Sequence, residues 1–159
     1  ATNPVNASVL GKEGMSNINI PIGIGAGSYD PATPFVFEQV RSFPCVTATP
    51  RYLFLEEGQA HIDFSQVDGG TSKIMGMLPS LQLPSPDLLS AYSRAVRIAF
   101  FEVYIAKNED YLPYLSPAYA AYLSQGEEFK AYMITEKSSP EFIEMINQFK
   151  RENGIPTSD

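Results

Sequence analysis

Three Ser-Pro pairs in the second half of the chain each stand directly before a stretch with the apolar spacing of a helix: Ser85-Pro86, Ser116-Pro117 and Ser139-Pro140. Serine is a favoured N-cap because its hydroxyl accepts a hydrogen bond from a first-turn amide that has no partner within the helix. Proline is tolerated at the next position, where its missing N–H costs nothing and its fixed φ suits the helix. The pairs therefore predict helix starts capped by Ser85, Ser116 and Ser139, and Ser139→Ala is expected to cost about 1 kcal/mol.

The front of the chain is rich in glycine and proline, and nine of the 11 glycines precede residue 80. Residues 1–34 predict an extended arm with at most one short strand, Asn17 to Ile22, where Ile18, Ile20 and Ile22 alternate. Ordering each residue costs on the order of 1–2 kcal/mol, and this segment holds few large apolar side chains to offset that cost. We therefore expect the arm to be buried against another chain in an assembly and mobile in the isolated protein.

The middle of the chain, residues 35–70, predicts strands. Apolar residues alternate from Phe35 to Phe43. The segments Val46 to Leu55 and Ala60 to Val67 are rich in strand-forming residues, and Glu56-Glu57-Gly58-Gln59 between them is typical of a turn. This pattern predicts a β-hairpin.

The back of the chain predicts helices. After a proline-rich connector over residues 71–86, the strongest helix is expected from Pro86 to about Lys107, and its second half is apolar on all sides, so another surface has to cover it. Further helices are expected at Pro117 to Ser124, Glu127 to Lys137 and Pro140 to Asn153. The fold is thus predicted to be a single α+β domain, in which an extended Gly/Pro-rich N-terminal arm and a β-hairpin pack on a small C-terminal bundle of three or four helices over residues 87–159.

Composition excludes several classes of function. A length of 159 residues is typical of one domain. The net charge of −7 argues against binding to nucleic acid or to an anionic membrane surface, because both depend on clustered Lys and Arg. No apolar run approaches the ~20 residues that a membrane-spanning helix needs. The lone Cys45 excludes an internal disulfide framework and a cysteine-based zinc site.

Two short motifs invite a chemical interpretation, and neither predicts one. Gly23-Ile-Gly-Ala-Gly27 has Ser28 where a dinucleotide fingerprint needs its third glycine, and the prolines that follow cannot open a helix. His61 and Asp63 would share one face of a strand, with Glu56 or Glu57 nearby in the turn, and such a set can hold a divalent metal or exchange protons. A solvated hairpin face explains them more simply, so we predict no metal, no cofactor and no catalytic role for His61.

Two groups of residues are candidate binding sites. Arg94 and Arg97 lie one helical turn apart and are candidates for contact with an anion, although a solvated helix face explains them as well. Tyrosine combines a large apolar body with a polar tip and is enriched where protein surfaces meet. The candidate partner-binding residues are Ile18, Ile20, Ile22, Phe35, Phe37, Phe101, Tyr104, Tyr111, Tyr114, Tyr119 and Tyr122. A tyrosine-rimmed core between short helices is the alternative interpretation of the tyrosines.

These observations lead to one functional hypothesis and one alternative. The hypothesis is a soluble, non-enzymatic structural or adaptor subunit of a larger protein assembly, whose partners are other protein subunits. An accessory subunit of an organellar or photosynthetic complex, processed to Ala1, and a virion-associated protein fit equally. The alternative is a small-molecule binding module or a carboxylate-dependent enzyme, with a pocket between the hairpin and the first long helix.

Overall fold

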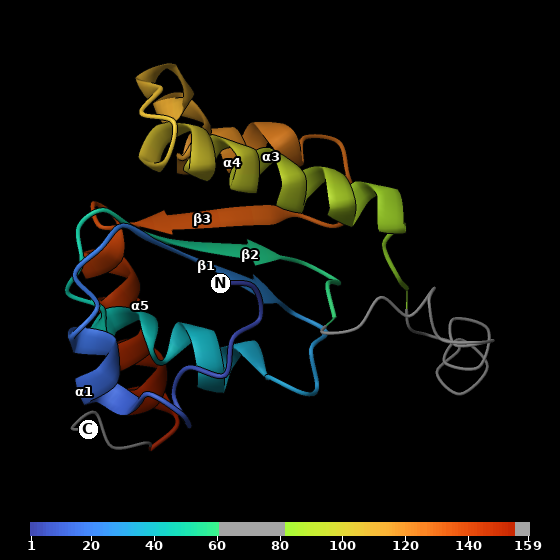
Figure 1. Ribbon diagram of the computed structural model, residues 1–159. Helices are drawn as coiled ribbons and strands as arrows, with labels where there is room; N and C mark the ends of the chain where they lie inside the picture. Colours follow the sequence, from blue (N-terminus) through green and yellow to red (C-terminus); the bar gives the residue numbers. More distant parts are fainter. Residues whose placement is uncertain (61–81, 155–159) are drawn as a thin grey trace.

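A three-stranded sheet forms the centre of the computed structural model, which describes residues 1–60 and 82–154. The strands lie in the order β1 (Ile22–Gly27), β2 (Arg51–Glu56) and β3 (Ala131–Thr135). β1 runs parallel to β2, and β3 runs antiparallel to it. Helices cover both faces of this sheet, as Figure 1 shows. The predicted α+β class is therefore confirmed.

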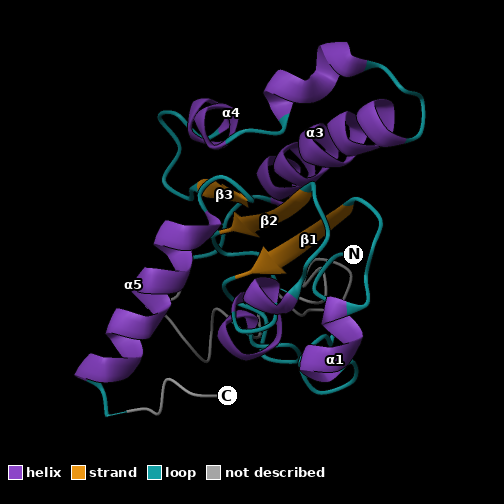
Figure 2. Cartoon of the chain, turned by 90° about the vertical axis from the view of Figure 1, so that its left-hand side faces the viewer, coloured by secondary structure: helices purple, strands orange, loops and turns teal. Residues whose placement is uncertain are grey.

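One face of the sheet is covered by three helices between residues 86 and 123 (Figure 2). These are α3 (Pro86–Tyr104), the 3₁₀-helix η4 (Glu109–Tyr114) and α4 (Pro117–Leu123). Side chains from α3 and from the central strands share one apolar cluster, in which Phe54 and Tyr92 are buried. The predicted caps of both α-helices are confirmed, because Ser85 Oγ accepts a hydrogen bond from Leu88 N (3.1 Å) and Ser116 Oγ accepts one from Tyr119 N (3.2 Å).

The opposite face is covered by four shorter or more peripheral helices: α1 (Gly11–Ser16), the π-helix η1 (Val36–Val40), the 3₁₀-helix η2 (Phe43–Cys45) and α5 (Ser139–Glu152). A second apolar cluster fills this side, and it includes Met15, Ile24 and Leu53. Successive residues of a strand point to opposite faces, so Leu53 enters this cluster while Phe54 enters the other.

The predicted cap at Ser139 is wrong. Helix α5 begins at Ser139, and the residue at its N-cap position is Ser138, whose side chain makes no capping bond. The Ser139 hydroxyl is buried and donates to the Thr135 carbonyl oxygen at 2.8 Å, while Ser138 Oγ accepts from Thr135 N at 3.0 Å. The turn between β3 and α5 is so short that both serine hydroxyls bond to the end of the strand.

β1 runs through the glycine-rich segment from Ile22 to Gly27. The predicted strand, Asn17 to Ile22, begins five residues earlier and shares only Ile22 with β1. Glycine lowers the strand propensity of a segment, because it loses more backbone freedom than other residues on folding. Here the neighbouring structure decides the outcome: Ile24 packs into the second cluster, and Gly23 lies so close to α3 that an added Cβ would be 3.4 Å from the Phe100 ring.

Other predicted elements differ from the structure because their apolar spacing is compatible with more than one type of secondary structure. The segment Phe35 to Phe43 was expected to be extended, yet it contains η1 and the first residue of η2. The helix expected from Glu127 to Lys137 is replaced by β3, in which Ala131, Met133 and Thr135 are buried and alternate with more exposed residues. The C-terminal part is therefore not a purely helical bundle, because one of its segments completes the sheet.

The predicted hairpin also differs from the strand pairing in the structure. All of β2 except its last residue, Glu56, lies within the first predicted strand, but its two neighbours are β1 and β3. The second predicted strand, Ala60 to Val67, lies outside the described residues except for Ala60, and so does most of the connector predicted at residues 71–86. The strand partners of β2 are distant from it in the sequence, so no local turn motif predicts their pairing.

The front segment is held within this chain by polar contacts as well as by apolar ones. Asn3 N donates to Gly25 O at 2.8 Å, and Gln39 Nε2 donates to Pro4 O at 2.6 Å. The Glu38 carboxylate accepts from Ala7 N at 2.9 Å. With α1 and β1 built into the domain, residues 1–34 are not the extended arm that was predicted. The chain itself supplies the surface that the sequence interpretation sought on a partner.

Gly27 ends β1 at a point where no side chain fits, and its replacement tests how closely the backbone is packed there. An added Cβ would lie 2.3 Å from the carbonyl oxygen of Gln59, which is a backbone atom that cannot turn aside. We expect Gly27→Ala to lower the free energy of unfolding by about 1–3 kcal/mol in urea denaturation. Gly25→Ala is the control, because its Cβ would meet its nearest atoms at 3.6 Å, and we expect a change of at most about 0.5 kcal/mol. Equal losses in the two variants would contradict this packing.

Candidate ligand-binding cleft

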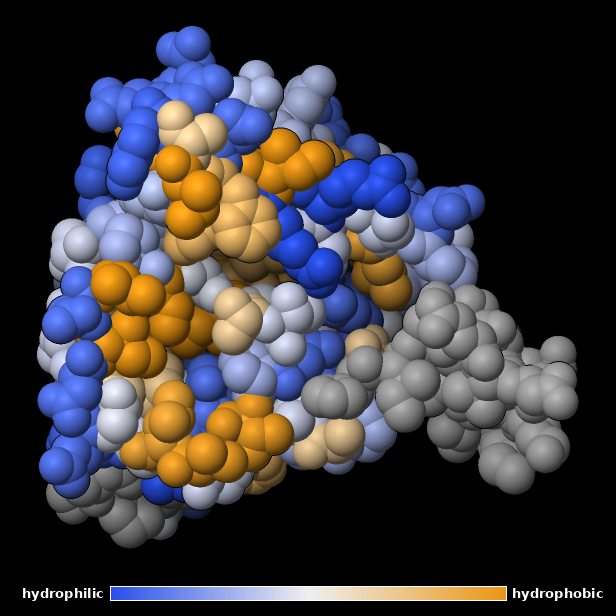
Figure 3. Space-filling view, in the orientation of Figure 1, coloured by the Kyte–Doolittle hydropathy of each residue, from blue (hydrophilic) through white to orange (hydrophobic). Residues whose placement is uncertain are grey.

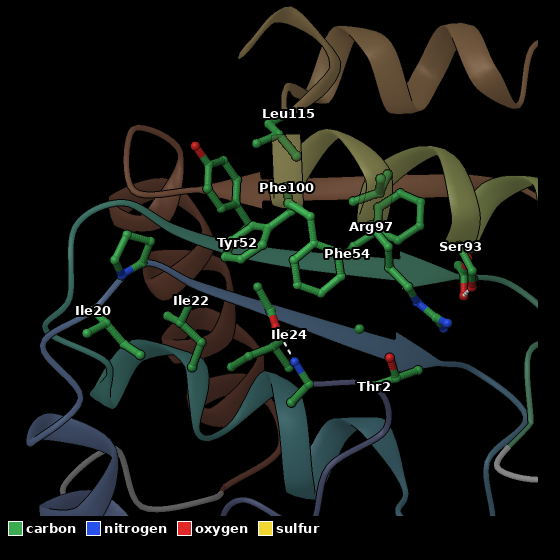
Figure 4. A pocket seen from close by; sticks show the side chains of 17 residues that line it. Thr2, Ile20, Ile22, Ile24, Tyr52, Phe54, Ser93, Arg97, Phe100 and Leu115 are labelled. Carbon is green, nitrogen blue, oxygen red and sulfur yellow. Dashed lines mark hydrogen bonds between the residues drawn. The ribbon is translucent and has the colours of Figure 1, made fainter. Parts of the chain in front are cut away.

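A cavity of about 360 Å³ lies between α3 and β1, bordered by β2 and by the first residues of the chain. We call it the α3–β1 cleft and define it by Gly23, Gly25, Glu56, Ser93, Arg97 and Phe100. Its volume is within the range of roughly 300–1,000 Å³ that is typical of small-molecule sites. Figure 4 shows its side chains converging from α3 above and from the strands below.

The cleft exists because the face of β1 that points to α3 carries glycines. Gly23 and Gly25 both line the cleft, and they present backbone where other strands present side chains. α3 contacts β2, whose Tyr52 and Phe54 fill the space beneath it. The backbone at Thr2 pairs with Gly25 along the outer edge of β1 and closes that side of the cleft.

One end of the cleft is apolar and the other is polar. Phe100 packs edge-on against Tyr52, with ring centroids 6.2 Å apart, and the Tyr52 hydroxyl pairs with that of Tyr104 at 2.6 Å. Figure 4 shows Ile20 and Tyr52 toward one end, and Arg97 and Ser93 toward the other. A ligand that fills this space therefore needs an apolar body and a polar group.

Glu56 is the buried acid of the polar end. It is the last residue of β2, its side chain is 1% exposed, and both carboxylate oxygens lie within hydrogen-bond distance of Ser93 Oγ (2.7 and 2.8 Å). Burial raises the pKa of Glu56 to about 7, although the Ser93 hydrogen bond and the positive charge of Arg97 both act to lower it. The carboxyl group thus changes its charge near neutral pH, at the wall of a cavity.

The two arginines that were predicted as one anion site have different surroundings. Arg97 lines the cleft and acts electrostatically on Glu56. Both arginines are exposed, but Arg94 does not line the cleft and donates to Ser90 Oγ of its own helix at 3.1 Å. The structure therefore does not bring the two guanidinium groups to one site.

The predicted partner-binding residues are distributed over several surfaces. Ile18, Ile22 and Phe35 pack against the second apolar cluster, and Tyr104 and Tyr111 pack against the first. Ile20 and Phe101 line the cleft and are also largely exposed. Phe37 is exposed on the η1 side, and Tyr114, Tyr119 and Tyr122 lie on η4 and α4. Figure 3 shows apolar side chains on this face in separate patches.

The acidic residues of the predicted hairpin are also not brought together at one site in the described part of the chain. Glu57 is not part of the cleft, and its carboxylate accepts from Lys130 N (2.8 Å) and Tyr132 Oη (2.9 Å). His61 and Asp63 lie outside the described residues. Within residues 1–60 and 82–154, no group of three or more His, Cys, Asp or Glu side chains is placed to hold a metal ion.

The sequence interpretation missed the pairing of Glu56 with Ser93. Glu56 was assigned to a turn, and Ser93 lies within the helix that was predicted from Pro86 to about Lys107. The two residues are 37 positions apart, so no local spacing connects them. The one signal present was the alternation of Gly23, Gly25 and Gly27, which marks a strand face without side chains.

The chain matches no protein-family model and no curated protein sequence. In the described part of the chain, none of the helices has the length and apolar character required to cross a membrane. The cleft is therefore interpreted from its own residues.

The charge change of Glu56 predicts how stability depends on pH. The folded protein keeps the proton of Glu56 up to about pH 7, whereas the unfolded chain releases it near the ordinary value of 4.5. The folded state then binds more protons in this window, so the free energy of unfolding falls as pH rises through it, by roughly 3 kcal/mol in total. We expect Glu56→Gln to remove this fall in urea denaturation between pH 4.5 and 8.

Glu57→Gln is the matched control, because it changes the adjacent carboxylate without touching the cleft. We expect this variant to keep the decline with pH even if its overall stability is lower. An unchanged pH dependence in Glu56→Gln would show that Glu56 does not titrate in this window.

Proposed function

We propose that this protein binds a small amphiphilic molecule in the α3–β1 cleft. The observation that carries the proposal is a buried carboxyl group, Glu56, at the wall of a largely apolar cavity of about 360 Å³. Apolar cavities with a few convergent polar groups and a strongly shifted pKa are the usual form of small-molecule sites. This proposal corresponds to the alternative of the sequence interpretation, with β1 in place of the predicted hairpin.

Binding explains the cleft better than catalysis does. A serine hydroxyl activated by a carboxylate base needs that base to be oriented in turn by a third group. Among the described residues, the partner of the Glu56 carboxylate is the Ser93 hydroxyl, and the Tyr52 hydroxyl is paired with Tyr104. We therefore assign the cleft to recognition, with Phe100 and Tyr52 contacting the apolar part of the ligand.

A panel of four small molecules with the same phenyl group and different polar groups tests the proposal. The probes are phenylalanine, phenethylamine, 3-phenylpropanoate and 3-phenylpropan-1-ol, added to the ¹⁵N-labelled full chain. We expect at least one of them to cause saturable NMR shifts at the amides of Gly23, Ser93 and Phe100. Absence of such shifts for all four probes, or shifts confined to other surfaces, would contradict the proposed function.

Two variants locate the binding. Gly23→Val keeps a residue suited to a strand and places methyl groups in the cleft beside the Phe100 ring, so we expect it to abolish the shifts. Ile105→Ser removes an apolar side chain that is 72% exposed and does not line the cleft, and we expect it to leave the shifts unchanged. Far-UV circular dichroism shows whether each variant is folded.

A row of tyrosines supports a second proposed function, contact with another protein. Tyr111, Tyr114, Tyr119 and Tyr122 follow one another along η4 and α4, with successive ring centroids 5.6, 4.9 and 6.3 Å apart. Tyr122 is 71% exposed, and such amphipathic rings are enriched at protein interfaces. An adaptor in an organellar or photosynthetic complex, or in a virion, would use this row as its contact surface.

Replacing two of these rings tests the second function. We expect Tyr114→Ser together with Tyr122→Ser to remove partners that co-purify with the native chain, because hot spots of interfaces are rich in tyrosine. Tyr132→Ser is the control, since Tyr132 is a similarly exposed tyrosine on β3. If the double variant retains all partners of the native chain, the row is not the contact surface.

A further inference from the structure

Three charged groups line the α3–β1 cleft: the Glu56 carboxylate, the Arg97 guanidinium and the amino group of Ala1, which donates to Gly23 O at 2.8 Å. The Glu56 carboxylate lies at the end of β2, and the Arg97 guanidinium extends from α3. Arg97 is close enough to lower the pKa of Glu56, yet no hydrogen bond or ion pair joins Arg97 to another residue in the described ranges. The walls of the cleft therefore carry an acid and a base that do not contact each other.

The Glu56 carboxylate also has unused capacity to accept hydrogen bonds. An ionised carboxylate offers about four acceptor positions, whereas one serine hydroxyl donates a single hydrogen. Within residues 1–60 and 82–154, Ser93 is the donor to this buried side chain. A group with several N–H donors fits these remaining positions, and an ammonium group carries three.

Neither a cation alone nor an anion alone complements both walls of the polar end. An ammonium group beside Glu56 would experience the like charge of Arg97, and a carboxylate beside Arg97 would experience that of Glu56. Repulsion of this kind is stronger where burial lowers the local dielectric, so it is stronger at Glu56, which is 1% exposed, than at Arg97, which is exposed. A polar group that carries both charges satisfies the acid and the base together.

We propose that the ligand of the cleft is an α-amino acid with a large apolar side chain. Its ammonium group would donate to the Glu56 carboxylate, its carboxylate would pair with Arg97, and its side chain would lie along Phe100 and Tyr52. This inference rests on the proposed binding function and adds to it the chemical class of the ligand. The cleft volume of about 360 Å³ accommodates a side chain of the size of leucine or phenylalanine.

Calorimetric titration of the full chain with the same four probes tests the ligand class. We expect phenylalanine to bind at least about tenfold more tightly than phenethylamine, 3-phenylpropanoate or 3-phenylpropan-1-ol, because each of the three lacks one or both charges. Equal or tighter binding of any of the three would overturn the amino-acid inference. The proposed function would survive that result, since a cleft that prefers the alcohol still binds an amphiphile, and it fails only if no probe reaches the cleft.

Three charge variants identify which side chain recognises which group. We expect Glu56→Gln to weaken phenylalanine and phenethylamine at least about tenfold while 3-phenylpropanoate is not weakened. Arg97→Gln should weaken phenylalanine and 3-phenylpropanoate by a similar factor while phenethylamine is not weakened. Arg94→Gln, which removes the same charge one helical turn away and outside the cleft, should leave all affinities unchanged.

The outcomes that overturn the assignment are equally specific. Unchanged affinity for phenylalanine in Arg97→Gln would remove the carboxylate contact, and equal losses in Arg94→Gln and Arg97→Gln would show a diffuse effect of net charge. Glu56→Gln replaces the carboxylate by an amide of the same length, and Arg97→Gln replaces the guanidinium by a shorter uncharged side chain. Circular dichroism shows whether each variant is folded before titration.

Discussion

Helix α3 packs over two strands, β1 and β2, that present very different surfaces to it. The rest of the structure depends on this difference. β2 presents Tyr52 and Phe54, which bury the apolar side of the helix. β1 presents the glycines of an alternating Gly-x-Gly pattern, with the backbone alone facing Phe100. Side-chain packing therefore supports α3 on one side and leaves a cavity on the other. The cleft is a direct consequence of the missing side chains.

Burial of Glu56 in this arrangement opposes the stability of the protein above neutral pH. An ionised carboxylate in an apolar setting is costly unless donors surround it, and among the described residues Ser93 is the one that donates. An uncharged residue at the end of β2, beneath α3, would cost less stability than a buried acid. A ligand that supplies the missing donors would explain why an acid occupies this position. Arg97 differs from Glu56, because it is exposed and water can solvate its guanidinium.

The sequence predicted those parts of the fold that depend on local chemistry. Ser85 and Ser116 cap their helices because a hydroxyl, a proline and an apolar spacing act within one turn. The predictions from sequence were wrong where contacts between distant segments determine the structure. β1 was predicted as a loose arm because glycine weakens an isolated strand, yet pairing with β2 orders it. β3 was predicted as a helix because its partner is 75 or more residues away. The arm was judged by its apolar side chains alone, whereas Asn3 and Gln39 fix it through hydrogen bonds.

The candidate site shows the same limit. Arg97 was identified, but with Arg94 as its companion, because helical spacing relates those two residues and nothing local relates Arg97 to Glu56. Glu56 was noticed as an acid of a turn, and its burial follows from β3 and α3 closing around the end of β2. The identity of a buried acid thus depends on three segments that meet only in the folded chain.

The central claim is that Glu56 is a buried acid at the wall of the cleft, and its own titration measures this most directly. The ¹³C resonance of the Glu56 side-chain carboxyl, assigned by comparison with Glu56→Gln, can be followed with pH in the folded protein. We predict a midpoint near pH 7, because burial raises the pKa of this group to about 7. A midpoint near the ordinary value of 4.5 would contradict the claim, because it would mean that water solvates the carboxylate.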